Sequence, residues 1–238
     1  MDAKNRQIIY AAVDQRIYKT IDGGQNWSLM FSEPRNQLIL ELQMDTYDTR
    51  RLYAGTNDGQ LLKSEDAGSS RTPIGNFDSK IKKILLDPRD TRRIYVGTST
   101  RSIFKTYNAG LTWESLRSQF ELFDNPASNV QDLILNKNQP DRLIVATAYG
   151  LLKSDDGGTR WTPFKLLTPP NTVTIRSVTQ NFAKPNEILY GTDQNLFKTV
   201  DGGKTWISKP LPTSRAAEAL VIDPTNPQIV YLGSLAIK

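Results

Sequence analysis

The 238-residue sequence predicts an all-β fold built from one repeated, four-stranded antiparallel unit. A short glycine-rich segment occurs five times, with its Thr or Ser at positions 20, 64, 106, 154 and 199, so that successive copies are 44, 42, 48 and 45 residues apart. Short apolar runs bounded by turn residues fill each interval, and no helical period of 3.6 residues competes with them. Four strands in a repeat of about 45 residues are typical of the blade of a β-propeller.

Residues 81–113 show the elements of one unit in order. The first strand, "IKKILLD", ends at the turn signal Asp87–Pro88. The second, "RRIYVGT", is expected to stop at Gly97, and "SIFKT" forms the third. The fourth follows the glycine-rich segment and carries Trp113. The same pattern predicts a single domain, 1–238, with blades near residues 1–30, 37–73, 80–116, 129–164 and 173–209 and a partial blade at 216–238.

The segment "KTVDGGKTW", residues 198–206, raises the question whether these glycine loops bind a ligand or only turn the chain. Glycine adopts positive φ without steric cost, and an Asp side chain accepts hydrogen bonds from the main-chain N–H groups of a turn. The Thr hydroxyl can brace the same turn, and the Trp can cover it. Neither the alternating oxygen ligands of a calcium loop nor the Gly-Lys-Ser/Thr of a phosphate loop is present in the sequence. We therefore expect the glycine loops to stabilise the turn between two strands and to bind no metal and no cofactor.

The five glycine loops resemble the Asp-box, or bacterial neuraminidase repeat, Ser/Thr-x-Asp-x-Gly-x-x-Trp. Three loops match it in full, whereas Asn108 replaces the Asp of the third loop and Arg71 replaces the Trp of the second. The resemblance implies a structural role for the matching positions, which are Thr20, Asp22, Gly24, Trp27, Ser64, Asp66, Gly68, Thr106, Asn108, Gly110, Trp113, Ser154, Asp156, Gly158, Trp161, Thr199, Asp201, Gly203 and Trp206.

Among Asp-box proteins, the short regular blades look most like those of the photosystem II assembly/stability factor family. That resemblance implies a ring of about seven blades and an exported, extracytoplasmic protein. The pattern starts at a second strand and ends without a sixth glycine loop, so we expect a fragment of a larger ring. The N-terminal "MDAKNRQIIY" lacks the apolar core of a signal peptide.

Composition excludes several kinds of chemistry. The chain has no Cys and no His, which removes thiolate nucleophiles, imidazole bases and the commonest zinc ligands. Its net charge of +5 is scattered over the repeats, and aromatic residues are not interleaved with a basic stripe. We therefore expect no nucleic-acid partner. No apolar run approaches the roughly 18 residues of a membrane-spanning helix.

The sequence favours a non-catalytic scaffold that binds a protein over an enzyme. Sialidases with this repeat carry an early Arg-Ile-Pro, but "QRIYKT" at 15–20 has Tyr in place of Pro. The carboxylates that could serve a xyloglucanase-type hydrolase, at Asp58, Glu121, Asp124 and Asp193, are interpreted as turn residues. A glycan-binding propeller is the first alternative, and a sialidase- or xyloglucanase-type glycoside hydrolase is the second.

Two sets of residues are candidates for binding a protein partner. The longest joint between blades, residues 114–129, carries Phe120, Leu122 and Phe123, which would form an apolar patch. The second set precedes the second strands of three consecutive blades and would form a basic arc beside the glycine loops. We favour the basic arc, whose members are Arg50, Arg51, Arg92, Arg93 and Arg142.

Overall fold

The computed structural model describes residues 1–2, 4–123, 125–223 and 225–236. The chain separates into two compact units, residues 1–115 and 116–238, and each unit is described by itself. The prediction of an all-β fold made of four-stranded antiparallel sheets is confirmed. The prediction of one domain over 1–238 stays a prediction.

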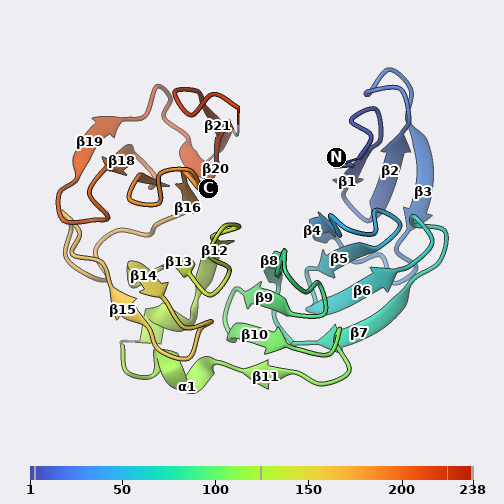
Figure 1. Ribbon diagram of the computed structural model, residues 1–238, viewed down its shortest axis with the longest axis horizontal. Coiled ribbons are helices and arrows are strands. Elements are labelled where there is room, and N and C mark those ends of the chain that lie inside the picture. Colours follow the sequence, from blue (N-terminus) through green and yellow to red (C-terminus); the bar gives the residue numbers. More distant parts are fainter. Residues whose placement is uncertain (3, 124, 224, 237–238) are drawn as a thin grey trace. The chain divides into compact units, whose positions relative to one another are not determined.

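Unit 1 contains three antiparallel sheets whose strands are neighbours in chain order (Figure 1). Blade 1 comprises β1 (Ile9–Val13), β2 (Arg16–Thr20) and β3 (Ser28–Ser32). Blade 2 comprises β4 (Ile39–Met44), β5 (Leu52–Thr56), β6 (Gln60–Ser64) and β7 (Thr72–Asn76). Blade 3 comprises β8 (Ile81–Leu86), β9 (Ile94–Thr98), β10 (Ser102–Thr106) and β11 (Glu114–Ser115).

Unit 2 begins with a short helix, α1 (Arg117–Phe120), and a 3₁₀ turn, η1 (Asn125–Ser128). Blade 4 comprises β12 (Val130–Leu135), β13 (Leu143–Thr147), β14 (Leu151–Ser154) and β15 (Thr162–Pro163). Blade 5 comprises β16 (Ser177–Gln180), β17 (Ile188–Gly191), β18 (Asn195–Thr199) and β19 (Ile207–Pro210). Blade 6 contains β20 (Ala216–Ile222) and β21 (Val230–Leu235). Within the described residues, no helix is long and apolar enough to span a membrane.

The register of the strands aligns the blades residue by residue. Blade 1 has no first strand among the described residues, so β1, β2 and β3 correspond to the second, third and fourth strands of the other blades. The Thr or Ser that opens each glycine loop is the last residue of the third strand, and it pairs with the first residue of the second strand. Thus Ser154 lies opposite Leu143 in blade 4, and Thr199 lies opposite Ile188 in blade 5. This common register allows equivalent positions in different blades to be compared directly.

Alternating side chains of neighbouring blades pack into the core of each unit. In unit 2, Ile144 and Leu151 of blade 4 belong to one buried cluster with Tyr190, Phe197 and Trp206 of blade 5. In unit 1, blades 1 and 2 share a buried cluster, as do blades 2 and 3. Since successive side chains of a strand point to opposite faces, blade 2 can bury one apolar face against blade 1 and the other against blade 3.

Strands β5 and β9 continue beyond the glycine near their ends, so the expected stop at Gly97 is wrong: β9 runs from Ile94 to Thr98. The glycines are required by packing between blades. A Cβ on Gly191 would lie 2.4 Å from the Cβ of Ala217 on β20, and a Cβ on Gly55 would lie 2.5 Å from Cγ2 of Ile81 on β8. The first strand of the next blade therefore approaches the second strand too closely for any side chain.

Candidate functional site

The glycine loops are closed by the same hydrogen bonds in all five blades that carry one. In blade 5, Thr199 Oγ1 donates to Asp201 Oδ1 over 2.7 Å and accepts from the N–H of Gly203 over 3.0 Å. Asp201 Oδ1 also accepts from the N–H of Lys204 and of Thr205, at 3.0 Å each, and its Oδ2 accepts from Thr205 Oγ1 at 2.6 Å. The hydroxyl-to-carboxyl (or amide) and glycine-to-hydroxyl bonds recur at Thr20, Ser64, Thr106 and Ser154.

These bonds hold the loop aspartates in their charged form. Donation by the Ser70 hydroxyl is the largest contribution that lowers the pKa of Asp66, to about 2. The pKa values of Asp22 and Asp201 are lowered as well. The largest cause is donation by the N–H of Asn26 for Asp22 and donation by the hydroxyl of Thr205 for Asp201. Among the described residues, no three acidic side chains are grouped so that they could hold a metal ion. The loop carboxylates therefore accept hydrogen bonds from the turn in which they lie.

The tryptophans of the glycine loops make two different connections. The indole Nε1 of Trp27 donates to Gly24 O, and that of Trp161 donates to Gly158 O, each at 3.1 Å and within its own loop. Those of Trp113 and Trp206 reach the preceding blade instead, at Ile74 O (2.8 Å) and Lys165 O (3.0 Å). In the second loop, the guanidinium of Arg71 lies over the ring of Phe31 in the preceding blade, with Cζ 3.7 Å from the ring centroid.

The arginines of the basic arc lie beside the glycine loops, four in unit 1 and Arg142 in unit 2. The main-chain oxygen of Arg50 accepts from the N–H of Ala67 at 2.8 Å, and that of Arg92 accepts from Ala109 at 2.9 Å. Every arginine of the set has an aspartate partner: Arg50 with Asp48 (2.9 Å), Arg51 with Asp45 (3.6 Å), Arg92 with Asp90 (2.8 Å), Arg93 with Asp87 (3.0 Å) and Arg142 with Asp155 (3.0 Å). Much of their charge is therefore compensated locally.

Several of these aspartates belong to a second repeated turn, which the sequence indicated at Asp87–Pro88 as the end of a first strand. An Asp or Asn precedes the second strand of each blade and accepts main-chain N–H groups of the next residues, as Asp45 does from Tyr47 at 2.8 Å. The same bonds occur at Asp2, Asp87, Asn136, Asn181 and Asp223. The signal was present in the sequence as an Asp or Asn at a fixed distance before each second strand.

The 114–129 joint places its three apolar candidates in different environments. Phe120 is only 2% exposed and packs on Trp161, with 5.1 Å between the ring centroids, so it belongs to the core. Leu122 is 81% exposed. The ring of Phe123 lies 5.5 Å from that of Tyr149, which is in the turn between β13 and β14. The structure therefore brings Phe123 to Tyr149, leaves Leu122 on the surface and removes Phe120 from the patch.

A pocket of about 330 Å³ adjoins Tyr149. The segment that connects blades 4 and 5 forms its other side with Leu166, Leu167, Pro169 and Pro170. A hydrogen bond of 3.0 Å from the N–H of Asn171 to Tyr149 O joins this segment to the turn. Sequence reasoning missed this site, which we call the Tyr149 pocket, although the run "KLLTPP" (165–170) shows apolar residues and prolines outside a strand.

The carboxylates considered for glycoside hydrolysis are paired with arginines. Asp58 lies 2.8 Å from Arg35, and Asp193 lies 2.7 Å from Arg176. Glu121 lies 3.7 Å from Arg117 on α1, while Asp124 lies outside the described residues.

Comparison with known proteins identifies the fold. No family model matches the sequence, and no curated protein matches it. Among solved structures, an ancestral GH74 enzyme superimposes with a TM-score of 0.75 at 15% identity, over 99% of this chain and 34% of that one. The extracellular domain of the putative one component system BT4673 from B. thetaiotaomicron gives 0.74 at 15%, over 95% and 29%. The fold is a β-propeller.

A further β-propeller of similar structure is YCF48 bound to D1 peptide, with a TM-score of 0.52 at 16% identity, over 95% of this chain and 86% of that one. These propellers include enzymes and non-enzymes, so the likeness establishes the fold alone. The chain spans only about a third of the length of the GH74 enzyme.

Proposed function

We propose that the chain is a non-catalytic propeller scaffold that binds a protein partner through the Tyr149 pocket, through Phe123, whose ring contacts Tyr149, and through the exposed Leu122 that precedes Phe123 in the sequence. The observation that carries the proposal is the combination of an almost fully exposed Leu122 with an aromatic pair beside a pocket lined by Leu166, Leu167 and two prolines. Exposed apolar groups around a preformed pocket are typical of the anchor points of protein interfaces.

A peptide segment with an apolar side chain fits this site better than a sugar or a nucleic acid. The Tyr149 pocket is lined mainly by apolar side chains, together with Lys165 and Thr168. The likeness to YCF48, which was solved with a D1 peptide, supports a protein partner for this propeller too. We further propose that the glycine loops are Asp-boxes, that the chain is related to the photosystem II assembly/stability factors, and that it acts outside the cytoplasm, as the extracellular BT4673 domain does.

The basic arc is the second candidate for the binding surface. Arg50 and Arg92 keep side chains that are 71% and 72% exposed, although each pairs with an aspartate. Exposed ion pairs of this kind are weak, so a carboxylate of a partner can exchange with the internal one. Binding through the arc would weaken as salt rises, whereas binding through the Tyr149 pocket would be nearly insensitive to salt.

Affinity capture from lysate of the source organism, at low and at high salt, tests the two surfaces. We expect the same protein to be captured at both salt concentrations by the parent chain and to be lost with Leu122→Asp or Tyr149→Ala. The double variant Arg50→Glu, Arg92→Glu is the matched control and should capture as the parent does. If capture survives both apolar substitutions and is lost with the arginine variant, the partner binds through the basic arc.

Two alternatives predict different results. A glycan-binding propeller would bind a defined oligosaccharide on a glycan array, with competition by the free sugar. A glycoside hydrolase would release sugar from xyloglucan or from sialosides, and replacing Asp58 or Asp193 with Asn would abolish the release. We expect neither activity, because both carboxylates are engaged by arginines at 2.8 and 2.7 Å.

A further inference from the structure

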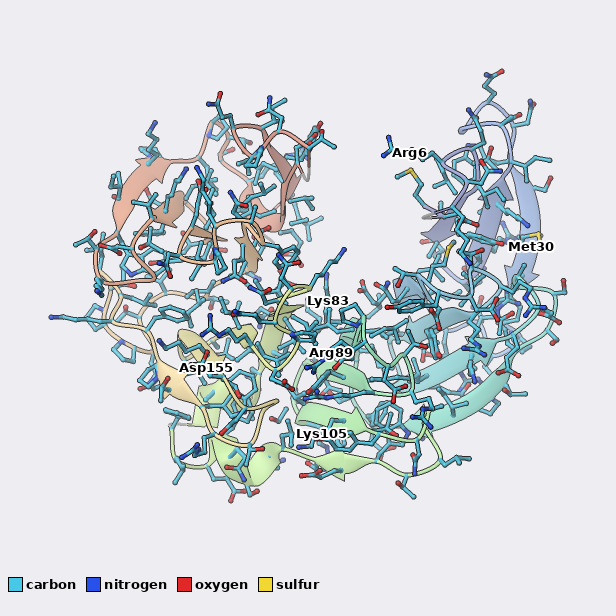
Figure 2. The ribbon with its side chains drawn as sticks, viewed as in Figure 1. Arg6, Met30, Lys83, Arg89, Lys105 and Asp155 are labelled. Carbon is cyan, nitrogen blue, oxygen red and sulfur yellow. The ribbon has the colours of Figure 1, made fainter. Side chains whose placement is uncertain are left out.

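A second pocket in unit 2 lies at the other end of the β13–β14 hairpin from Tyr149. It has a volume of about 200 Å³ and is bordered by Arg142, which precedes β13, and by Lys153 at the end of β14. Asp155, labelled in Figure 2, directly follows β14 and also borders the pocket. The opposite wall comes from blade 5, with Asn186 and Gly202. We call it the Lys153 pocket.

The lysine at this position has a carboxylate partner in blades 2, 3 and 5 but, within the described part of the chain, not in blades 1 and 4. In blade 1, Lys19 has no carboxylate within 4.0 Å among the described residues, and its Nζ lies 5.4 Å from the ring centroid of Tyr10. Every third strand has a Lys immediately before the hydroxyl residue of the glycine loop. In blades 2, 3 and 5 its ammonium has a carboxylate partner: Lys63 with Glu65 (2.8 Å), Lys105 with Glu114 (3.4 Å) and Lys198 with Glu187 (2.5 Å). Among the described residues, Lys153 has no carboxylate within 4.0 Å, and its Nζ lies 5.4 Å from the ring centroid of Phe164.

The common register explains why Lys153 lacks a partner. The position of Glu187, immediately before the second strand, is occupied in blade 4 by a cation, Arg142. The position of Glu65 is occupied by Asp155, but this carboxylate lies 3.0 Å from Arg142. Two cations and one carboxylate therefore border the pocket, which leaves one positive charge in excess.

The remaining groups of the pocket can complete the coordination of a single anion. The side-chain amide of Asn186 borders the pocket and has no hydrogen-bond partner among the described residues. Gln180, in contrast, is fixed, because it donates to Pro185 O over 2.6 Å and accepts from Asn136 over 3.0 Å. The walls also include the apolar side chains of Ile144 and Phe164. An ammonium and a neutral amide beside apolar carbon suit an organic monoanion rather than a multiply charged phosphate.

We propose that the Lys153 pocket binds the carboxylate of an organic acid with an apolar body, with Lys153 as its counter-ion. The ligand's carboxylate takes the place that Glu65, Glu114 and Glu187 fill in blades 2, 3 and 5, and Asp155 competes with it for Arg142. The same chemistry is offered by the C-terminal carboxylate of a peptide and by a free small acid. The two pockets share Phe164 in their walls, but Lys153 and Asn186 line only this one and Tyr149 lines only the other, so either proposal can fail without the other.

Two probes represent the two sources of a carboxylate. N-acetyl-leucine stands for a peptide C-terminus and benzoate for a small acid, and N-acetyl-leucinamide and benzamide are their uncharged controls. Titration into the ¹⁵N-labelled 238-residue chain should give saturable shifts of the amide resonances of Ser154, Asp155 and Asn186 with the acids. The uncharged amides should bind at least about tenfold more weakly, since they lack the ionic contact. Tighter binding of N-acetyl-leucine identifies a peptide terminus, and tighter binding of benzoate a small acid.

Substitutions decide whether Lys153 is the counter-ion. Lys153→Met should weaken binding of the acid at least about tenfold, as expected for loss of a charge-assisted contact. Lys63→Met, at the equivalent position of blade 2, removes the same charge and should leave binding unchanged. Asp155→Asn should strengthen binding several-fold, because it removes the competing carboxylate. The proposal is overturned if neither acid gives saturable shifts, if acid and amide bind equally, or if Asp155→Asn weakens binding.

Discussion

The indole Nε1 of Trp206 donates a 3.0 Å hydrogen bond to the main-chain oxygen of Lys165 in the preceding blade. Its ring makes edge contacts with Phe164 and Tyr190, with centroid distances of 6.1 and 4.9 Å. Trp27 bonds only within its own loop and is 43% exposed, whereas Trp206 is 8% exposed. Residues at the same repeat position therefore differ in how much packing between blades depends on them.

This difference predicts unequal costs of truncation. Trp206→Ala should reduce the free energy of unfolding by about 3–5 kcal/mol, the range for removal of a large buried aromatic side chain. Trp27→Ala should reduce it by about 1 kcal/mol, as is typical of a partly exposed site. Urea unfolding followed by fluorescence measures both values. Equal losses would show that the contact of Trp206 with blade 4 adds nothing to stability.

The repeat made the blades predictable from the sequence, but the exposure and contacts of the candidate binding residues were less predictable. The position of each strand followed from spacing and turn residues, because local pattern determines them. Phe120 and Phe123 could not be distinguished in this way: the first packs on Trp161 and the second on Tyr149, and both contacts depend on tertiary packing. The aspartate partners of Arg50 and Arg92 lie two residues earlier in the sequence and could have been anticipated.

Acid should destabilise the fold in a narrow range of pH. The pKa values of Asp22, Asp66 and Asp201 are lowered in the folded chain, that of Asp66 to about 2. A folded-state pKa below the unfolded value of about 3.9 contributes stability that is present above that pH and is lost as the pH falls through the folded pKa. We expect Tm to be constant from about pH 7 to 5 and to fall from about pH 4 to 2.

The third glycine loop supplies the variant that tests this cause. Asn108 makes the same bonds with an amide, which does not titrate: it accepts from Thr106 Oγ1 at 2.8 Å and from the N–H of Thr112 at 3.0 Å. Replacing Asp22, Asp66 and Asp201 together by Asn should therefore reduce the loss of Tm between about pH 4 and 2. Asp14→Asn, in the turn between β1 and β2, is the control. If the triple variant loses as much Tm as the parent over this pH range, the groups that titrate are not these three aspartates.

Calcium should leave the stability unchanged. Calcium prefers 6–8 oxygen ligands, and both carboxylate oxygens of Asp201 already accept hydrogen bonds from Thr199 and from residues 204–205. Thermal unfolding in calcium and in a chelator should give the same Tm. A rise of about 5 °C or more with calcium would require a bound ion that stabilises the folded state and would contradict the structural role of the loops.

Removing the hydroxyl of Tyr190 should stabilise unit 2. Within the part of the chain that the structure describes, this oxygen is buried and has no hydrogen-bond partner, and burial raises the pKa of the phenol. The ring stacks on Phe197 at 4.5 Å, a contact that phenylalanine would keep. Tyr190→Phe should increase the free energy of unfolding by about 1 kcal/mol, because it relieves an unsatisfied buried polar group. A decrease of that size would instead indicate that the hydroxyl is hydrogen-bonded in solution.

Restoring tryptophan at position 71 should be neutral or stabilising. Burial lowers the pKa of the Arg71 guanidinium to about 10, and its Nη2 is buried with no hydrogen-bond partner among the described residues. The stacking of Arg71 on Phe31 offsets part of this cost, since a cation over an aromatic ring contributes about 0.5–2 kcal/mol. Arg71→Trp replaces it with the aromatic contact that Trp113 and Trp206 make with their preceding blades.

Urea unfolding of Arg71→Trp beside Arg71→Met separates the two contributions. Methionine removes the charge and the unpaired N–H but adds no ring. The free energy of unfolding of Arg71→Met should therefore be lower than that of Arg71→Trp. We expect a gain of up to about 2 kcal/mol for Arg71→Trp, within the range for relieving one unsatisfied buried donor. A loss of several kcal/mol would show that the guanidinium of Arg71 has a specific role that its contact with Phe31 does not account for.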